Sequence, residues 1–548
     1  SDRAGADNLD IWVKQVGGSE PIRLTQSVAN ENEPSFSPDG TSIVYRSDAD
    51  GGGIYVVPAL GGRERRVAGN GRHPRFSPDG RWIAYWAGKM HGRSAPLGFS
   101  RRAKMYVAPA SGGPARQLRA DFAGAAYPVW SPDGRHILFL GQRDTTSPPE
   151  ESVDWWVTPL DDTAPARTEV FEVTRKENLS GPIRFYSWAL VPAAWDSAVD
   201  SILFSANAGD STNLWRVPID SGNWKVTGTP IRLTSGPALE ENPSVAWPVG
   251  APARVAFAVA TENTEIFSLP VAVNEAKVLG EARQLTTNSA ADFHPSTSPD
   301  GRSLVFVSNR TGDQEVWIKD LASGQESALT ATRTGKYVPL FSPDGSQISF
   351  SSYENLHRWE TYVVPATGGA PEKLCDGLLF GWSSDGTRFF HHEGDWRLRL
   401  FDMKSRRDSL WAGMPGRTFC CGRFSPDNRW VAFFDNGFFR SYIAPFRGES
   451  PIPEHEWIDL GEDQMLWWSP DGNTIYGQRE RDGHLCLWAQ RLDPATKRLA
   501  GPPLPIFHSH SSRRSLGNQA NPHPFVSRDR IVFSMGERTA NIWMAEFR

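Results

Sequence analysis

Short stretches in which apolar residues alternate with polar ones recur along the whole chain, and most of them come in pairs. A pair typically opens with a proline followed by an aromatic residue, as in Pro34-Ser-Phe36 and Pro74-Arg-Phe76, and continues after a turn with Ile43-Val-Tyr45 or Ile83-Ala-Tyr85. A period of two is typical of half-buried β-strands. We therefore expect a chain of short strands joined by tight turns.

The turn inside many of these pairs is the tetrapeptide Ser-Pro-Asp-Gly. It begins at Ser37, Ser77, Ser131, Ser298, Ser342 and Ser469. Proline presets the backbone for a tight turn, aspartate can bond its own backbone, and glycine accepts the final turn position. Each copy therefore predicts a hairpin.

A third and a fourth strand follow each hairpin. Ile54-Tyr-Val-Val57, for example, leads through Gly61-Gly62 to Arg65. Four strands in a unit of about 40 to 60 residues are the pattern of a β-propeller blade, and blades need neighbours on both sides. With degenerate copies included, about eleven first hairpins are present, so we expect an all-β fold of tandem β-propellers with four-stranded antiparallel blades.

About eleven blades are too many for one ring, since propellers typically have about four to eight. The last repeat offers three strands, at Phe525, at Ile531 to Ser534 and at Asn541 to Glu546, and Arg283 to Thr286 can donate a fourth. We therefore expect a six-bladed second propeller at residues 282–548.

The first propeller is expected at residues 1–281. Ser1 to Lys14 resembles Ser308 to Lys319, which follows a second strand, so residue 1 falls in the middle of a blade. We expect this ring to be six-bladed as well, to lack two upstream strands, and to belong to a native protein that extends beyond Ser1.

Composition fits a chain with more than one core. The 22 Trp and 29 Phe supply large side chains to fill the space between sheets. A net charge of only −5 argues against a nucleic-acid or anionic-membrane partner.

The chain has four cysteines, and they form no Cys-x-x-Cys motif: Cys375, Cys420, Cys421 and Cys486. We expect free thiols, with disulfides as the alternative in an oxidising compartment.

The repeat resembles that of TolB-type propellers. The resemblance lies in the Phe-Ser-Pro-Asp-Gly sequence, in the Gly-Gly turn after the third strand, and in the pairs Leu24-Thr25, Leu233-Thr234, Leu285-Thr286 and Leu329-Thr330. Asn8 to Val13 and Asn213 to Pro218 further resemble the C-terminal propeller regions of bacterial membrane-bound serine/threonine kinases and winged-helix regulators. That resemblance implies an extracytoplasmic (periplasmic or cell-surface) sensor or interaction module. It also implies a membrane link only through an upstream segment.

The chain lacks the motifs of the enzymes that carry such propellers. It contains no glycine-rich loop before a strand lysine, no His-Arg-Asp and no Asp-Phe-Gly, and it has no Gly-x-Ser-x-Gly elbow. Kinase activity would therefore lie in another domain, and no catalytic or cofactor-binding residue is predicted here.

Three histidines stand directly before the proline that opens an inner strand: His73, His294 and His523. Inner strands converge on the axis of a propeller, so these residues are expected to line the channel mouth. His294 and His523 are also candidate ligands for a metal ion in the channel, although two ligands fall short of the usual three or four. Polar channel lining is the default, because Glu33, Tyr127, Asn242 and Val338 occupy the same position in other repeats.

Two function classes therefore remain. The first is a non-catalytic propeller that binds a protein or small ligand at a ring face, without a cofactor. The second is a channel-site enzyme, a metal-dependent lyase or lactonase-like hydrolase, which needs several histidines and carboxylates at one mouth.

Overall fold

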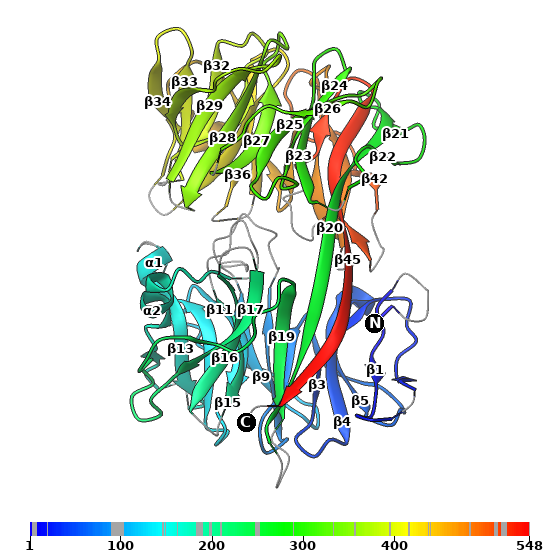
Figure 1. Cartoon of the computed structure of the whole chain (residues 1–548), viewed down its shortest axis with the longest axis vertical. Coiled ribbons are helices and arrows are strands. Elements are labelled where there is room, and N and C mark those ends of the chain that lie inside the picture. Colours follow the sequence, from blue (N-terminus) through cyan, green and yellow to red (C-terminus); the bar gives the residue numbers. More distant parts are fainter. Residues whose placement is uncertain are drawn as a thin grey trace. The chain divides into compact units, whose positions relative to one another are not determined.

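The structure is a computed structural model, and nearly all of its regular elements are β-strands (Figure 1). It describes the chain except residues 3–7, 19, 89–102, 145–146, 148, 162, 182–189, 197–199, 209–210, 247–251, 289, 333, 356–357, 394–395, 415–416, 437, 439, 482–483, 509–512, 517–522 and 547–548. Most of the strands form four-stranded antiparallel sheets, which confirms the predicted propeller blades.

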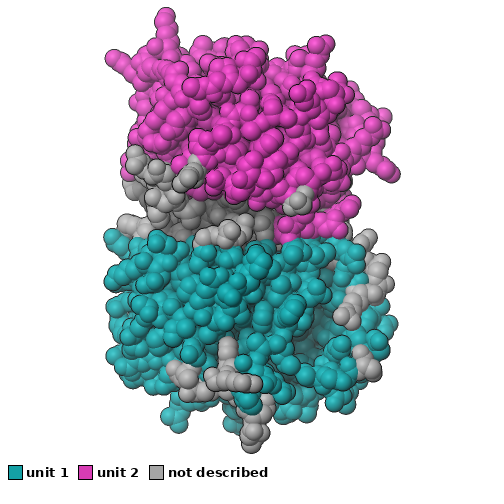
Figure 2. Space-filling view, in the orientation of Figure 1, with its two compact units in different colours: residues 1–261, 511–513, 538–548 teal, residues 262–510, 514–537 magenta. Residues whose placement is uncertain are grey.

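The chain divides into two compact units (Figure 2). Unit 1 holds residues 1–261, 511–513 and 538–548, and unit 2 holds residues 262–510 and 514–537. These bounds differ from the expected 1–281 and 282–548, because two long strands, described below, each supply residues to both units.

Unit 1 begins with a two-stranded sheet, β1 (Trp12–Val13) and β2 (Ile22–Arg23). Its complete sheets are β3 (Glu31–Phe36), β4 (Ser42–Ser47), β5 (Gly53–Pro58) and β6 (Arg65–Gly69); β7 (Arg72–Phe76), β8 (Trp82–Ala87), β9 (Lys104–Pro109) and β10 (Arg116–Leu118); and β11 (Gly124–Trp130), β12 (His136–Gln142), β13 (Val153–Pro159) and β14 (Ala166–Arg167). They are followed by β15 (Pro192–Asp196), β16 (Ser201–Ala208), β17 (Ser211–Pro218), β18 (Ile231–Arg232) and β19 (Leu239–Ala246). The inner strands β3, β7, β11, β15 and β19 contact one another in that order.

Unit 2 contains five sheets formed by consecutive strands. They are β23 (Asp292–Thr297), β24 (Ser303–Ser308), β25 (Glu315–Asp320) and β26 (Glu326–Ala328); β27 (Gly335–Phe341), β28 (Gln347–Asn355), β29 (Arg358–Pro365) and β30 (Glu372–Asp376); β31 (Leu378–Trp382), β32 (Arg388–His392), β33 (Leu398–Asp402) and β34 (Arg407–Ala412); β35 (Phe419–Phe424), β36 (Trp430–Asp435), β37 (Arg440–Pro445) and β38 (Ile458–Gly461); and β39 (Gln464–Trp468), β40 (Thr474–Arg481), β41 (His484–Arg491) and β42 (Leu504–Phe507).

A further sheet of unit 2 combines strands from distant parts of the sequence. β44 (Phe525–Val526) and the first half of β45 (Arg530–Glu546) lie beside the second half of β20 (Arg254–Ala272), which pairs with β22 (Arg283–Gln284) and β21 (Lys277–Val278). The inner strands β23, β27, β31, β35, β39 and β44 contact one another in that order, and β44 returns to contact β23. These contacts run in a closed circle within unit 2. Six blades in each ring stays a prediction.

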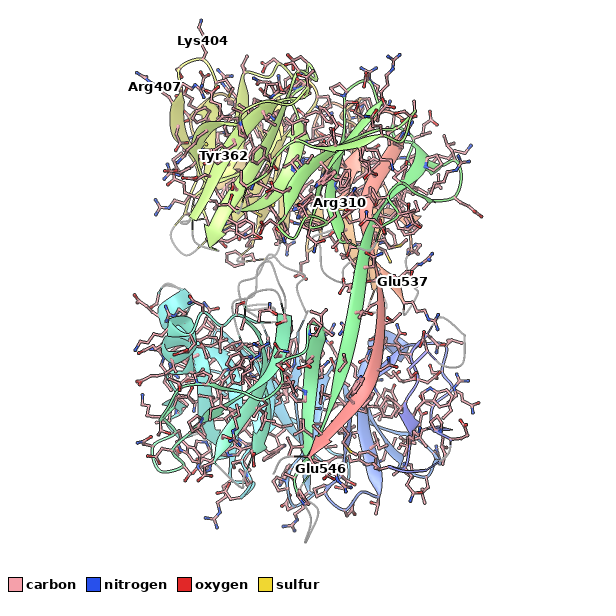
Figure 3. All side chains as sticks on the ribbon, viewed as in Figure 1. Arg310, Tyr362, Lys404, Arg407, Glu537 and Glu546 are labelled. Carbon is pink, nitrogen blue, oxygen red and sulfur yellow. The ribbon has the colours of Figure 1, made fainter. Side chains whose placement is uncertain are left out.

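The expectation for the end of the chain is wrong in one respect. Asn541 to Glu546 does not form the third strand beside Ile531, because residues 530–546 are one continuous strand whose last residues belong to unit 1. There β45 lies beside β20, with Thr539 bonded to Thr261 at 2.8 Å and Glu546 paired with Arg254 at 3.1 Å. Figure 3 labels Glu537 and Glu546 on this strand.

The Ser-Pro-Asp-Gly turns form as predicted. In the first copy the Ser37 hydroxyl donates to Asp39 at 2.5 Å, the Gly40 amide bonds the Ser37 carbonyl at 2.9 Å, and Gly40 has a φ of 70°. The same serine–aspartate bond recurs at 2.6 Å in the copies that begin at Ser298 and Ser469. These local contacts explain why the turn sequence repeats.

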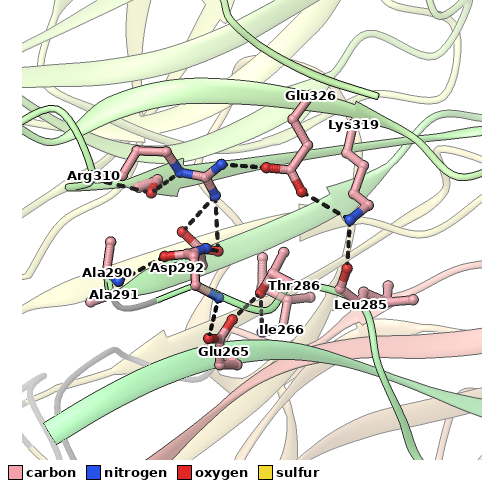
Figure 4. Close-up of polar contacts among 12 residues, drawn as sticks. Glu265, Ile266, Leu285, Thr286, Ala290, Ala291, Asp292, Arg310, Lys319 and Glu326 are labelled. Carbon is pink, nitrogen blue, oxygen red and sulfur yellow. Dashed lines mark hydrogen bonds and ion pairs between the residues drawn. The ribbon is translucent and has the colours of Figure 1, made fainter. Parts of the chain in front are cut away.

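The Leu-Thr pairs have a structural role that the sequence alone did not assign. The Thr286 hydroxyl accepts the Ile266 amide at 3.0 Å and donates to the buried Glu265 carboxylate at 2.5 Å (Figure 4). Thr25 and Thr330 accept the amides of Ile11 and Val316 in the same way, both at 2.9 Å. The threonine therefore satisfies a backbone donor at the start of a third strand.

Figure 4 also shows how this sheet joins the next one in unit 2. The Asn288 side-chain amide donates to the Asp292 carboxylate at 2.6 Å, and the Arg310 guanidinium donates to the same carboxylate at 3.1 Å. Glu326 accepts from Arg310 and, at 2.8 Å, from Lys319. The charges at this junction are therefore paired within the described network.

Large apolar side chains are buried between the sheets, as expected. Trp86, Trp155 and Trp411 are fully buried. Two short helices, α1 (Pro149–Ser152) and α2 (Val170–Lys176), were not predicted, and α2 packs Val170 and Phe171 into the core of unit 1. Within the described residues, no helix combines the length and apolar character that crossing a bilayer requires.

Candidate functional site

A backbone irregularity positions the side chains at the centre of each unit. The residue before the proline of an inner strand has a left-handed backbone, with φ values of 55° at Glu33, 48° at His73, 55° at His294 and 43° at Val338. The strand pairing shifts at each of these points, which marks a β-bulge. Such a conformation costs of order 1 kcal/mol or more in a residue other than glycine, and strain of this kind concentrates at functional sites.

In unit 2, His294 and His523 lie together. Both imidazoles are buried, and their ring centroids lie 5.1 Å apart. The Tyr337 hydroxyl lies 3.2 Å from Nε2 of His523, and the Tyr337 ring lies 4.2 Å from that of His294. The two predicted metal candidates therefore share one site.

A small pocket opens beside these histidines. Its walls include Trp467 on β39 and Arg423 on β35, and its cavity volume is about 10 Å³. The Arg423 guanidinium carbon lies 5.2 Å from the centroid of the Trp467 ring. That volume is far below the range of about 300–1,000 Å³ usual for drug-sized ligands and is close to the space that one water molecule needs.

Arg423, Tyr337 and Trp467 were missed by sequence reasoning. A signal for Arg423 was available, because Arg-Phe-Ser-Pro-Asp occurs at residues 75–79 and again at residues 423–427. Arg75 and Arg423 thus hold the same place in their repeats, one in each unit.

His73 lies in unit 1, in a cluster of its own. Its Nε2 lies 3.2 Å from Oε1 of Glu33, and its backbone amide donates to the other carboxylate oxygen at 2.7 Å. The Tyr127 ring lies 4.8 Å from the imidazole. The structure therefore pairs His73 with a carboxylate.

Burial shapes the ionisation of this cluster. It lowers the pKa of His73 to about 4, against the opposing effect of Glu33. Burial alone would raise the pKa of Glu33, but the charges of His73 and Arg46 and the His73 amide outweigh it, so that pKa is lowered. Burial also lowers the pKa of Arg75, and the charge that opposes this is Glu33.

The predicted metal role of the histidines stays a prediction. His294 and His523 supply two imidazoles, whereas sites of the zinc type use three or four protein ligands. Among the residues that the structure describes, no group of three or more His, Cys, Asp or Glu side chains is placed to hold a metal ion.

The cysteines are thiols in this structure. Cys420, Cys421 and Cys486 are buried and Cys375 is half-buried. Sγ of Cys420 lies 2.7 Å from Sγ of Cys421, on the same strand as Arg423. Burial raises the pKa of Cys375 to about 12, so that thiol is protonated at neutral pH.

Comparison with known proteins agrees with this architecture. Residues 2–96 match the family model of the TolB beta propeller domain. Residues 2–96 are therefore TolB-type propeller repeats. An uncharacterized protein of Agrobacterium fabrum is 31% identical over 126 residues, which cover 20% of this chain and 42% of that protein. A TolB homolog of Chlorobium chlorochromatii is 32% identical over 137 residues, covering 24% of this chain and 31% of the homolog.

The TolB-type match therefore spans less than half the length of these two curated relatives. Among solved structures, oligogalacturonate lyase in complex with manganese is 12% identical, covers 77% of this chain and 88% of its own, and has a TM-score of 0.25. A similarity this low carries no information about the function of this chain.

Proposed function

We propose that this chain is a non-catalytic binding module that holds a small ligand or a protein partner at a ring face. We further propose that it serves as a sensor or scaffold domain of a larger extracytoplasmic protein or assembly. Its TolB-type repeats support a binding or scaffold role. Partners other than nucleic acid are expected, and attachment to a membrane would come only through a segment upstream.

The observation that carries the proposal is the pocket of unit 2. Its walls come from separate sheets: His294 from β23, Arg423 from β35, Trp467 from β39, and His523 beside β44. Side chains from distant repeats therefore converge on one concave site, which combines an aromatic surface with a few polar groups. That combination is typical of ligand pockets.

The alternative is a channel-site enzyme, and one observation favours it. The imidazoles of His294 and His523 lie 5.1 Å apart, close enough for both to contact one bound group. A bound metal ion would need further ligands, from a substrate or from water.

One experiment separates the two functions. The purified chain is screened by thermal shift against small acids, sugars and peptides, with and without manganese, and every stabilising compound is recovered and analysed by mass spectrometry. A binding module returns each compound chemically unchanged. Metal-dependent turnover that is lost in both His294→Ala and His523→Ala, but kept in the unit 1 control His73→Ala, would contradict the proposal and support the enzyme.

A further inference from the structure

The arginines at equivalent places in the two units have different surroundings. Arg75 on β7 and Arg423 on β35 both stand before the phenylalanine of Phe-Ser-Pro-Asp. Arg75 has the Glu33 carboxylate as its opposing charge. In unit 1 the repeat therefore supplies an anion of its own.

Among the described residues, Arg423 has no carboxylate partner of this kind. Within the described part of the chain, no carboxylate forms an ion pair with Arg423, and its buried Nε has no hydrogen-bond partner. The strand before β35 is β31, in which Leu379 stands four residues before the turn serine Ser383, whereas Glu33 stands four residues before Ser37 on the strand before β7. An apolar residue thus stands at the position where unit 1 has an acid.

The free energy of a half-buried guanidinium such as that of Arg423 depends on whether an anion lies beside it. Removing a charge from water costs several kcal/mol unless an opposite charge and hydrogen bonds compensate. Burial lowers the pKa of Arg423 to about 10, and the groups that oppose this are the thiols of Cys421 and Cys420. Since the side chain stays protonated at neutral pH, the pocket holds a positive charge that its own walls do not neutralise.

We infer that the unit 2 pocket is a receptor for a carboxylate, which the Arg423 guanidinium binds in the role that Glu33 has beside Arg75. A guanidinium fork matches the two oxygens of a carboxylate. The Trp467 ring fixes the guanidinium from one side, and His294 and His523 line the same pocket and can donate to the anion. The inference rests on the proposed binding function and names the chemical class of its ligand.

Two kinds of molecule present this group: a small carboxylic acid and the C-terminal carboxylate of a peptide. The pocket is open to solvent and its cavity volume is only about 10 Å³, so it can take no more than the end of a ligand. Either source would place its carboxylate on Arg423 and extend the rest of the ligand outward.

Calorimetric titration of the whole chain tests the inference. The probes are acetate, its neutral isostere acetamide, inorganic phosphate, and the tripeptide Gly-Gly-Ala as the free acid and as the C-terminal amide, all at constant ionic strength. Acetate should bind, and acetamide should not. Tighter binding of the tripeptide acid than of its amide would identify a chain end as the source, whereas binding of acetate alone would identify a small acid.

Variants of Arg423 test whether this residue binds the carboxylate. Arg423→Met should weaken acetate binding at least tenfold, and Arg423→Lys, which keeps the charge but loses the fork, should weaken it several-fold. The matched control Arg75→Lys in unit 1 should leave it unchanged. Unaltered binding in Arg423→Met, phosphate binding as tight as acetate, or no binding of any carboxylate probe would overturn the inference.

These outcomes are distinct from failure of the proposed function. A chain that binds no carboxylate but is stabilised by another compound, recovered unchanged, keeps the proposed function and loses this inference. Arg423→Met removes an uncompensated charge, so loss of folding is not expected. Its thermal midpoint should equal or exceed that of the wild type in carboxylate-free buffer, and a clearly lower midpoint would also count against the inference.

Discussion

The two units place an arginine at the same point of the same repeat but neutralise it differently. In unit 1, Arg75 lies in a cluster with Glu33 and His73, in which the carboxylate bonds both the imidazole and the backbone. In unit 2, Arg423 faces a pocket shared with two histidines and a tryptophan. The difference indicates that one repeat can build either a closed ionic core or an open receptor, depending on one residue in the neighbouring strand.

The largest expected effect comes from breaking the closed cluster. Glu33→Gln keeps the shape of the side chain but leaves Arg75 without its anion. Glu33 also accepts the His73 amide, and a hydrogen bond to a charged group is typically worth about 1.5 to 3 kcal/mol, so we expect a loss of this size in the free energy of unfolding of unit 1. Urea denaturation followed by hydrogen exchange of β3 and β7 measures it, and an unchanged stability would show that Arg75 does not depend on Glu33.

Acid should weaken unit 1 through His73. Its folded-state pKa of about 4 lies below the usual unfolded value of about 6.5. The stability from the neutral imidazole is therefore fully present above pH 6.5 and is lost as the pH falls toward 4. At about 1.36 kcal/mol per pKa unit, the loss approaches about 3 kcal/mol.

His73→Gln isolates this effect, because it removes the titrating group and keeps a polar side chain. The difference in unfolding free energy between wild type and variant, measured from pH 7 to pH 4.5, should shift in favour of the variant as the pH falls. A constant difference over that range would contradict the assignment.

Substitution of the threonine in a Leu-Thr pair should lower the stability of both units by a similar amount. The two units would then differ only in the residues at their ring centres. Thr25→Val and Thr286→Val each leave a buried backbone amide, of Ile11 and Ile266, without its acceptor. An unsatisfied buried group costs about 1 to 3 kcal/mol. Thermal unfolding of both variants should give similar losses, and a loss in one unit only would show that the repeat has different roles.

The smallest effect is expected at Arg423. Arg423→Met should leave unit 2 unchanged or stabilise it by about 1 kcal/mol in the absence of carboxylates, because an apolar side chain removes the desolvation cost of a half-buried charge that has no ion pair within the described residues. The decisive point is that Arg423→Met should not lower the free energy of unfolding, whereas Glu33→Gln should lower it. Thermal unfolding in chloride buffer measures it.

Much of the fold could be predicted because its signals are local. Asp39 and Gly40 form their turn with neighbours in the sequence, and the alternation of residues 42–47 marks a strand by itself. The extent of β20 and β45 could not be predicted, because a continuous strand such as Arg530–Glu546 has the same alternation as two short ones. Which strand pairs with residues 541–546 is decided by long-range contacts.

The site was predictable in part for the same reason. His294 and His523 were identified because each precedes a proline at the start of an inner strand. Their proximity, and the presence of Tyr337 and Trp467 beside them, depends on how the strands of unit 2 converge. The missing carboxylate at Arg423 is a property of the neighbouring strand and is invisible in the motif itself.

The most direct test of the account compares both arginines in one molecule. Hydrogen exchange of the intact chain is measured by mass spectrometry with acetate and with chloride at equal ionic strength. Acetate should slow exchange in the unit 2 strands β35 and β39, which carry Arg423 and Trp467, and leave β3 and β7 of unit 1 unchanged. Equal slowing in both units, or no slowing in β35 and β39, would contradict the claim that unit 2 holds an open carboxylate receptor.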